Sequence, residues 1–160
     1  MKKNQLSFGY IKTEGIGTQC EFDTYELIRA SKLQVIHQED VFMHYIMLRE
    51  HQPILFDLKG DLNDIWKIQG AGRLIGTTVR AFIVTGEDAI QKLYSIKLQI
   101  RAKYAVPCEF DRPKEMSYPN YIHAADNYEQ VEQDIRVLIP SKLKLCQATN
   151  GIHPISKRVW

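Results

Sequence analysis

The order of predicted strands and helices indicates an α+β protein in which helices cover one antiparallel sheet. Two observations support this fold class. Short apolar runs typical of strands recur along the chain, and segments with apolar residues at helical spacing separate them, without internal repeats. The length of 160 residues suits one domain with its own hydrophobic core.

The first third of the chain alternates between strand and helix patterns. Residues 6–11 predict a strand, and residues 13–17 the turn that follows it. Residues 21–30 carry apolar side chains at helical spacing and predict a first helix. Residues 33–36 predict a second strand, and residues 39–50 a second helix.

The middle of the chain contains the clearest strand pattern. Residues 54–66 predict a further helix, although Gly60 weakens its helical propensity. Residues 69–73, Gln-Gly-Ala-Gly-Arg, predict a flexible loop, because they lack the spacing of a phosphate-binding P-loop. Residues 77–85 predict a strand that is apolar on both faces and therefore buried, and residues 87–104 predict a long helix.

The last part of the chain completes the fold prediction. A short strand at residues 121–122 and a helix over residues 127–138 follow a loop rich in proline and charge. The resulting order indicates a βαββαβ ferredoxin-like sandwich over residues 1–140. Residues 141–160 lack a sustained period and predict an extended tail, whose apolar side chains dock on the domain or a neighbouring subunit.

The composition is that of a soluble globular protein. Hydrophobic residues make up 44% of the chain, and the formal net charge of +2 gives no reason to expect nucleic-acid binding. No apolar run is long enough to span a membrane, and the chain starts without a signal-peptide pattern. Cys20, Cys108 and Cys146 fit neither a disulfide framework nor a zinc signature, so we expect a reducing cytoplasm.

His123 is the strongest candidate for chemistry, because it lies in a tight connection between a strand and a helix. Asp126 is the expected cap of that helix, with Glu129 completing a capping box. Asp134 is a carboxylate that could orient the imidazole, which could then act as a base or as a covalent nucleophile. The alternative is a structural histidine that ends a strand and forms local hydrogen bonds.

Three segments, in the same order, resemble the nucleoside diphosphate kinase family. Residues 120–129 resemble its Asn-x-x-His-Gly-Ser-Asp-Ser active-site segment. Residues 8–16 resemble its first strand, which ends in Ile-Lys-Pro-Asp-Gly-Val, and residues 44–53 resemble its His-Tyr-x-x-Leu segment with a following proline. The resemblance spans residues 6–139 and implies the same ferredoxin-like fold in a divergent member.

The resemblance also implies a function. In the family, a histidine takes the γ-phosphoryl group of a nucleoside triphosphate, bound with Mg²⁺, and passes it to a diphosphate acceptor. His123 matches that histidine, and Asp134 replaces the family's supporting glutamate. The matching nucleotide- and phosphate-binding positions are Lys12, Tyr45, Arg101 with Arg112 as its rival, Asn120, and Ile54 and Leu55 near the base. No protein ligand for a metal is predicted, and the resemblance implies a homo-oligomer.

The sequence departs from the family at several positions. Ala124 and Ala125 replace the glycine and serine after the histidine, Asp134 is shorter than the family's glutamate, and the segment between Gly86 and Arg101 is shortened. Compared with the family, residues 57–76 resemble an insertion, and the loop at residues 105–119 is longer. Candidates to replace the lost phosphate contacts are Arg73, Lys103, Arg112 and Lys114. Two alternatives therefore stay open: a non-catalytic nucleotide-binding or interaction module, and a specialised kinase with another phosphorylated acceptor.

Overall fold

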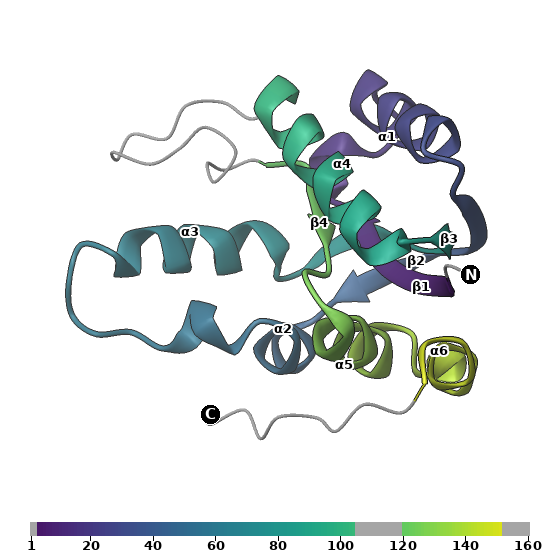
Figure 1. Cartoon of the computed structure of the whole chain (residues 1–160). Coiled ribbons are helices and arrows are strands. Elements are labelled where there is room, and N and C mark those ends of the chain that lie inside the picture. The colour runs from purple at the N-terminus through teal and green to yellow at the C-terminus, as the bar shows by residue number, and fades with distance from the viewer. Residues whose placement is uncertain (1–2, 105–119, 152–160) are drawn as a thin grey trace.

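The computed structural model describes residues 3–104 and 120–151, and it has one four-stranded antiparallel sheet in the order β2-β3-β1-β4 (Figure 1). This confirms the predicted α+β sandwich with an antiparallel sheet covered by helices. No helix of these residues is long and apolar enough to cross a membrane. The elements are β1 (Asn4–Ile11), η1 (Thr13–Gly15), α1 (Gln19–Ala30), β2 (Gln34–Met43), α2 (Tyr45–His51), η2 (Pro53–Phe56), α3 (Asp64–Leu74), β3 (Thr77–Glu87), α4 (Ala89–Tyr104), β4 (Ile122–Ala124), α5 (Tyr128–Leu138), η4 (Pro140–Lys142) and α6 (Leu143–Asn150).

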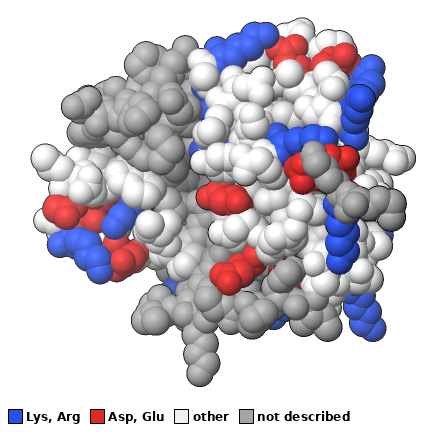
Figure 2. Space-filling model, in the orientation of Figure 1, with Lys and Arg blue, Asp and Glu red and all other residues white. Residues whose placement is uncertain are grey.

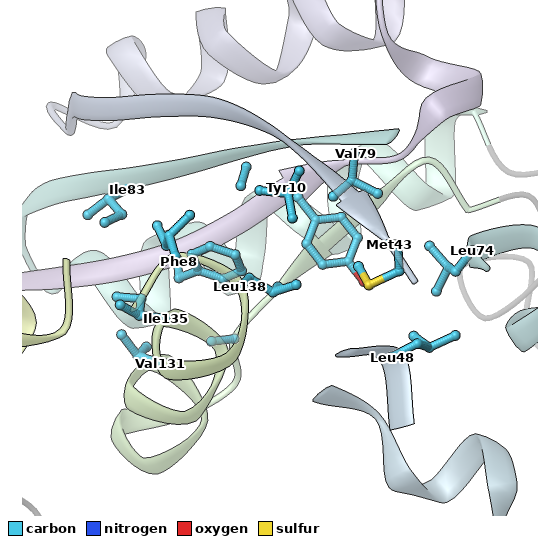
Figure 3. Packing of buried hydrophobic residues seen from close by; sticks show 14 of the residues in the cluster. Phe8, Tyr10, Met43, Leu48, Leu74, Val79, Ile83, Val131, Ile135 and Leu138 are labelled. Carbon is cyan, nitrogen blue, oxygen red and sulfur yellow. The ribbon is translucent and has the colours of Figure 1, made fainter. Parts of the chain in front are cut away.

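Strand β1 lies inside the sheet and supplies buried side chains to both of its faces. Phe8 and Tyr10 point to the face covered by α2, α5 and α6, where they pack with Leu138 (Figure 3). Ile11 points to the opposite face, which α1 and α4 cover. Successive residues of a strand face opposite sides, so this single strand joins the two halves of the core.

Strand β2 is longer than predicted, and the expected helix over residues 39–50 is wrong in its first part. Residues Glu39 to Met43 continue the pairing with β3, where Asp40 lies opposite Arg80 and forms an ion pair with it. Helix α2 begins only at Tyr45, after His44 accepts a hydrogen bond from the Met47 amide. Cross-strand pairing with β3 outweighs the local helical pattern here.

The helix predicted over residues 54–66 and the glycine-rich loop at 69–73 are also wrong. In place of a continuous helix over residues 54–66, the chain forms the short 3-10 helix η2 and then a loop in which Gly60 has a positive φ of 79°. Helix α3 then runs through the supposed loop. Gly70 and Ala71 are buried in this helix.

The chain after α5 is helical where an extended tail was expected. Residues 140–150 form η4 and α6, and α6 is held to β1 by Asn150, whose side chain accepts from the Leu6 amide and donates to the Leu6 carbonyl. These two hydrogen bonds resemble those that a neighbouring strand would form. They satisfy the backbone amide and carbonyl of Leu6 in β1. The division into a domain at 1–140 and a tail at 141–160 stays a prediction, and residues 152–160 lie outside the described part.

Gly9 is required for the close approach of β4 to β1. A Cβ atom added at Gly9 would lie 2.8 Å from the His123 carbonyl oxygen and 2.9 Å from the Phe82 ring. Because one of these neighbours is backbone, we expect Gly9→Ala to displace β4 and to lower the free energy of unfolding by about 1–3 kcal/mol. Urea denaturation of Gly9→Ala and of the control Gly72→Ala, whose added Cβ meets nothing within 4 Å, checks this. Equal stability of the two variants would contradict it.

Candidate active site

A sharp backbone turn sets the position of His123. The Ile122 amide donates to the Asn120 carbonyl at 2.7 Å, which closes a three-residue turn around Tyr121, whose φ is 64°. The Tyr121 carbonyl accepts from the Lys12 amide at 2.8 Å. A bulky residue at positive φ is strained and persists only where its surroundings hold it. The end of β1 therefore holds the start of β4, with His123 one residue into the strand.

Helix α5 follows the histidine as predicted, but with a different cap. Asn127, and not Asp126, accepts from the Gln130 amide, while the Gln130 side chain accepts from the Asp126 amide. The cap is thus shifted by one residue from the predicted one, and the return hydrogen bond is made to the residue before the cap. Asp126 instead pairs with the buried Lys97 of α4 at 2.5 Å, so the strand-to-helix connection is tied to the opposite helix layer.

Asp134 bridges two buried histidines. One carboxylate oxygen lies 2.8 Å from His123 Nε2, and the other lies 2.9 Å from Nδ1 of His51. Although Asp134 is shorter than the family's glutamate, its carboxylate reaches the imidazole of His123. His51 Nε2 lies 3.1 Å from the hydroxyl of Tyr10, whose ring stacks on His123 at 4.8 Å between centroids.

Burial and this network fix the protonation of the cluster. Burial lowers the pKa of His123 to about 4, although Asp134 acts in the opposite direction. Burial alone would raise the pKa of Asp134, but the two histidines outweigh it and hold the value at about 2. His123 is therefore neutral at physiological pH and donates its Nε2–H to an ionised carboxylate. The lone pair of Nδ1 is then the nucleophilic one.

The same three residues place ligand atoms within 4.8 Å of one another, a spacing that a metal ion could bridge. However, both Asp134 oxygens already accept from a histidine, and the second nitrogen of His51 is matched by Tyr10. Both Asp134 oxygens and both nitrogens of His51 therefore have hydrogen-bond partners without an ion, and we interpret the cluster as a hydrogen-bond network.

Lys12 is a second buried polar residue beside β4. Its ammonium group donates to the Asn120 side chain, so the structure brings these two predicted residues together. Burial, reinforced by the charge of Arg101, lowers the pKa of Lys12 to about 7. Arg73 and Lys97 act in the same direction, and Glu14 opposes them. This surplus of positive charge favours an anion at this place.

Arg101 of α4 is anchored to β4. Its Nε and one terminal nitrogen donate to the Ile122 carbonyl at 3.0 and 2.8 Å, which holds the guanidinium group next to the strand that carries His123. Its rival Arg112, and Lys114, lie outside the described residues. Lys103 contacts Asp23 of α1 at 2.7 Å, and its role is therefore that of an ion-pair partner.

The structure places Tyr45, for which the resemblance implies a phosphate contact, at the protein surface. Tyr45 is 49% exposed at the start of α2, and its ring meets Phe56 edge to face at 5.3 Å. The tyrosine that contacts His123 is Tyr10. Leu55 is buried in the core, and Phe56 is partly buried against it. Ile54, 57% exposed, and Tyr45 are the exposed apolar side chains of this region.

Sequence reasoning missed Tyr10 and His51. Tyr10 is paired with His123 in the β1–β4 register, a relation that no local pattern reveals. His51 lies three residues after the buried Leu48, on the inward face of α2. A histidine at a core position of a short helix needs a polar partner. This requirement was the feature of the sequence that could have indicated His51 as a site residue.

Comparison with known proteins identifies the fold. No protein-family model matches the chain, and no curated protein matches its sequence. Among solved structures, the apo nucleoside diphosphate kinase of Encephalitozoon cuniculi superposes with a TM-score of 0.62 at 17% identity, covering 95% of this chain and 94% of that one. The enzyme of Borrelia burgdorferi, with bound vanadate and ADP, gives 0.61 at 17% identity over 84% and 86%.

The enzyme of Halobacterium salinarum in complex with CDP gives a TM-score of 0.62 at 16% identity, covering 85% of this chain and 91% of that one. The chain thus has the fold of the nucleoside diphosphate kinases, as the resemblance of its three segments implied. The likeness at this identity establishes the fold, and the chemistry has to be argued from the residues of the site.

Proposed function

We propose that this protein is a divergent nucleoside diphosphate kinase-like phosphotransferase, which moves the γ-phosphoryl group of a nucleoside triphosphate through a phosphohistidine at His123. The observation that carries the proposal is the geometry around that side chain. It is a buried imidazole whose Nε2 lies 2.8 Å from an Asp134 oxygen, with Lys12 and Arg101 on the neighbouring elements.

In the proposed reaction, the lone pair of His123 Nδ1 attacks the γ-phosphorus, and the bond between that phosphorus and the β–γ bridging oxygen breaks. The nucleoside diphosphate leaves with the bonding electron pair. The ring becomes positively charged, and Asp134 stabilises it through the Nε2–H hydrogen bond. The terminal phosphate oxygen of a second diphosphate then takes the phosphoryl group, and the lone pair returns to Nδ1.

Lys12 and Arg101 would neutralise the phosphate charge in this reaction, and Asn120 would hold Lys12 in place. Mg²⁺ would enter with the nucleotide and be bound mainly by phosphate oxygens. Glu14 fits as an oxygen ligand, because it lies near enough to Lys12 to raise its pKa and its Oε1 is buried without a hydrogen-bond partner among the described residues. The ion would supply further charge neutralisation of the phosphates.

The apolar surface of Ile54, Phe56 and Tyr45 is the candidate platform for the base. An aliphatic and aromatic surface buries any base without reading its hydrogen-bonding edge. The proposed substrates are therefore nucleoside triphosphates and diphosphates, without a strong base preference.

One observation favours a second candidate, a nucleotide-binding module that has lost transfer. Ala125 is fully buried at the position where the family has a serine. The contact that the serine hydroxyl makes in the family is therefore missing at this position. A specialised kinase, with another phosphorylated acceptor, is the remaining alternative. A turnover assay distinguishes the two kinases from the non-catalytic module, and a comparison of acceptors distinguishes the two kinases from each other.

We propose a homo-oligomer in the cytoplasm as the working form. Strand β2 lies at the edge of the sheet, and Ile36 and Phe42 on it are 40% and 58% exposed. Unpaired edge strands with apolar side chains readily pair with a second copy. Charged residues of both signs are interspersed over the face seen in Figure 2. Light scattering that gives a monomer mass at micromolar concentration would contradict this proposal.

Lys12 makes nucleotide affinity depend on pH. The pKa of Lys12 is about 7 in the free protein, and a bound polyphosphate raises it by favouring the charged form. Affinity should therefore be nearly constant below about pH 7 and should fall above it, approaching tenfold per pH unit. Calorimetry in buffers of different ionisation enthalpy should detect the proton uptake. Wild-type affinity that does not change above pH 7 would contradict the assignment.

The proposed function is tested by a two-step transfer experiment. Wild-type protein is incubated with γ-labelled ATP and Mg²⁺, freed of nucleotide, and then given unlabelled diphosphate. We expect acid-labile label on the protein, discharged as labelled triphosphate. His123→Ala should lose both steps, and the control His37→Ala, which changes a histidine paired with Glu39 on β2, should retain them. Wild-type protein that binds nucleotide without becoming labelled would establish the non-catalytic module instead.

A further inference from the structure

His51 is a buried polar side chain that the proposed reaction does not itself use. It lies at the end of α2 and is 1% exposed. Its Nδ1 lies 2.9 Å from an oxygen of Asp134, and its Nε2 lies 3.1 Å from the Tyr10 hydroxyl. Both ring nitrogens are therefore occupied by partners from other elements, α5 and β1. An imidazole fixed at both nitrogens can impose a proton arrangement on its neighbours.

With both histidines in the neutral form, an ionised Asp134 leaves one arrangement for their protons. An ionised Asp134 has no proton to give, so each histidine that meets it must donate. His51 then carries its proton on Nδ1, and its Nε2 accepts from the Tyr10 hydroxyl at 3.1 Å or from the Gln52 side-chain amide at 3.3 Å. His123 carries its proton on Nε2, which leaves the lone pair on Nδ1.

The same residues also fix the plane of the His123 ring. His51 meets it edge to face at 4.9 Å and 87°, and Tyr10 stacks on it at 4.8 Å and 23°. Without the donor on His51, one Asp134 oxygen would lose its partner, and the carboxylate would be free to rotate away from His123. A buried acceptor without a donor is costly, so such a rearrangement is expected.

We propose that His51 is a positioning residue for His123: by donating from Nδ1 to Asp134 it holds the carboxylate in the orientation that keeps the His123 proton on Nε2 and presents Nδ1 for phosphoryl transfer. The catalytic part of this inference rests on the proposed function, but the proton arrangement does not. The pattern is a histidine–carboxylate–histidine relay, extended by Tyr10, in which the outer histidine touches no substrate.

Two amide variants of the same residue test this inference. In His51→Asn the side-chain amide nitrogen takes the place of Nδ1 and keeps the donor to Asp134. In His51→Gln the amide takes the place of Nε2 and keeps only the link to Tyr10. Nitrogen-15 NMR of labelled histidine side chains reads the tautomer of His123 without any turnover. We expect the Nε2–H form in wild type and His51→Asn, and a mixture of tautomers in His51→Gln.

The kinetic readout distinguishes positioning from packing. The rate of phosphohistidine formation at saturating ATP should stay within about threefold in His51→Asn and fall roughly tenfold or more in His51→Gln, with KM unchanged in both. Equal losses in the two variants, or none in either, would overturn the inference, because both replace the ring with an amide. If wild type is never phosphorylated, the proposed function fails, whereas the NMR comparison still decides the role of His51.

Discussion

Asp134→Asn is expected to slow the formation of phosphohistidine by about a thousandfold, because an amide cannot accept from two histidines at once. One of its terminal atoms becomes a donor and faces a ring nitrogen that also carries a proton. Either His51 or His123 must then change its tautomer, and in the second case the lone pair of Nδ1 is lost. Single-turnover labelling with γ-labelled ATP measures the rate.

The matched control for Asp134→Asn is Glu132→Gln on the same helix. Glu132 is also buried, but it pairs with Arg136 and Gln147, away from the histidines. We expect Glu132→Gln to change stability and to leave the labelling rate within about threefold of wild type. A similar loss of rate in both variants would show that the helix α5 as a whole, and not the bridging carboxylate, is responsible.

Lys12→Met should lower the rate of phosphoryl transfer by about a hundred- to a thousandfold while leaving the protein at least as stable as wild type. The lysine charge matters most where negative charge develops on the transferred group. The lowered pKa of Lys12 shows that the folded protein disfavours this charge in the absence of a ligand. Replacing it by an apolar side chain of similar length removes that cost.

Lys67→Met is the control for burial of a lysine. Lys67 is also buried, but it donates to the Asp57 carbonyl and pairs with Asp64 near the start of α3. Its replacement should lower the free energy of unfolding without slowing transfer. If Lys12→Met instead unfolds the protein and Lys67→Met does not, the primary role of Lys12 is structural. Thermal unfolding and single-turnover labelling of both variants decide this.

The parts of the site that lie in local patterns could be predicted from the sequence. The sequence placed His123 just after a short strand, and the structure places it within that strand, β4, before helix α5. Lys12 directly follows the first strand, so both positions depend mainly on adjacent residues. Asn120 is close to His123 in the sequence, and its contact with Lys12 follows from the antiparallel pairing of β1 and β4. The ferredoxin-like sandwich was predictable because the element order restricts the possible topologies.

The remaining parts depend on tertiary contacts. The end of β2 has a helical pattern in isolation, and its pairing with β3 makes it a strand. Residues 69–73 contain two glycines, yet they lie in helix α3, where Gly70 and Ala71 are buried. The bridge from His51 to Asp134 joins residues 83 positions apart, and neither histidine nor aspartate at those positions is distinctive alone.

Locating the phosphoryl group on the intact protein tests the central claim most directly. The protein is phosphorylated with ATP and Mg²⁺, kept at alkaline pH to preserve phosphohistidine, digested and mapped by mass spectrometry, while phosphorus–nitrogen couplings in NMR identify the ring nitrogen. We predict a single phosphoryl group on Nδ1 of His123, a nitrogen left open because Asp134 binds Nε2. A phosphoryl group on Nε2 of His123, on another residue, or on none would contradict this account.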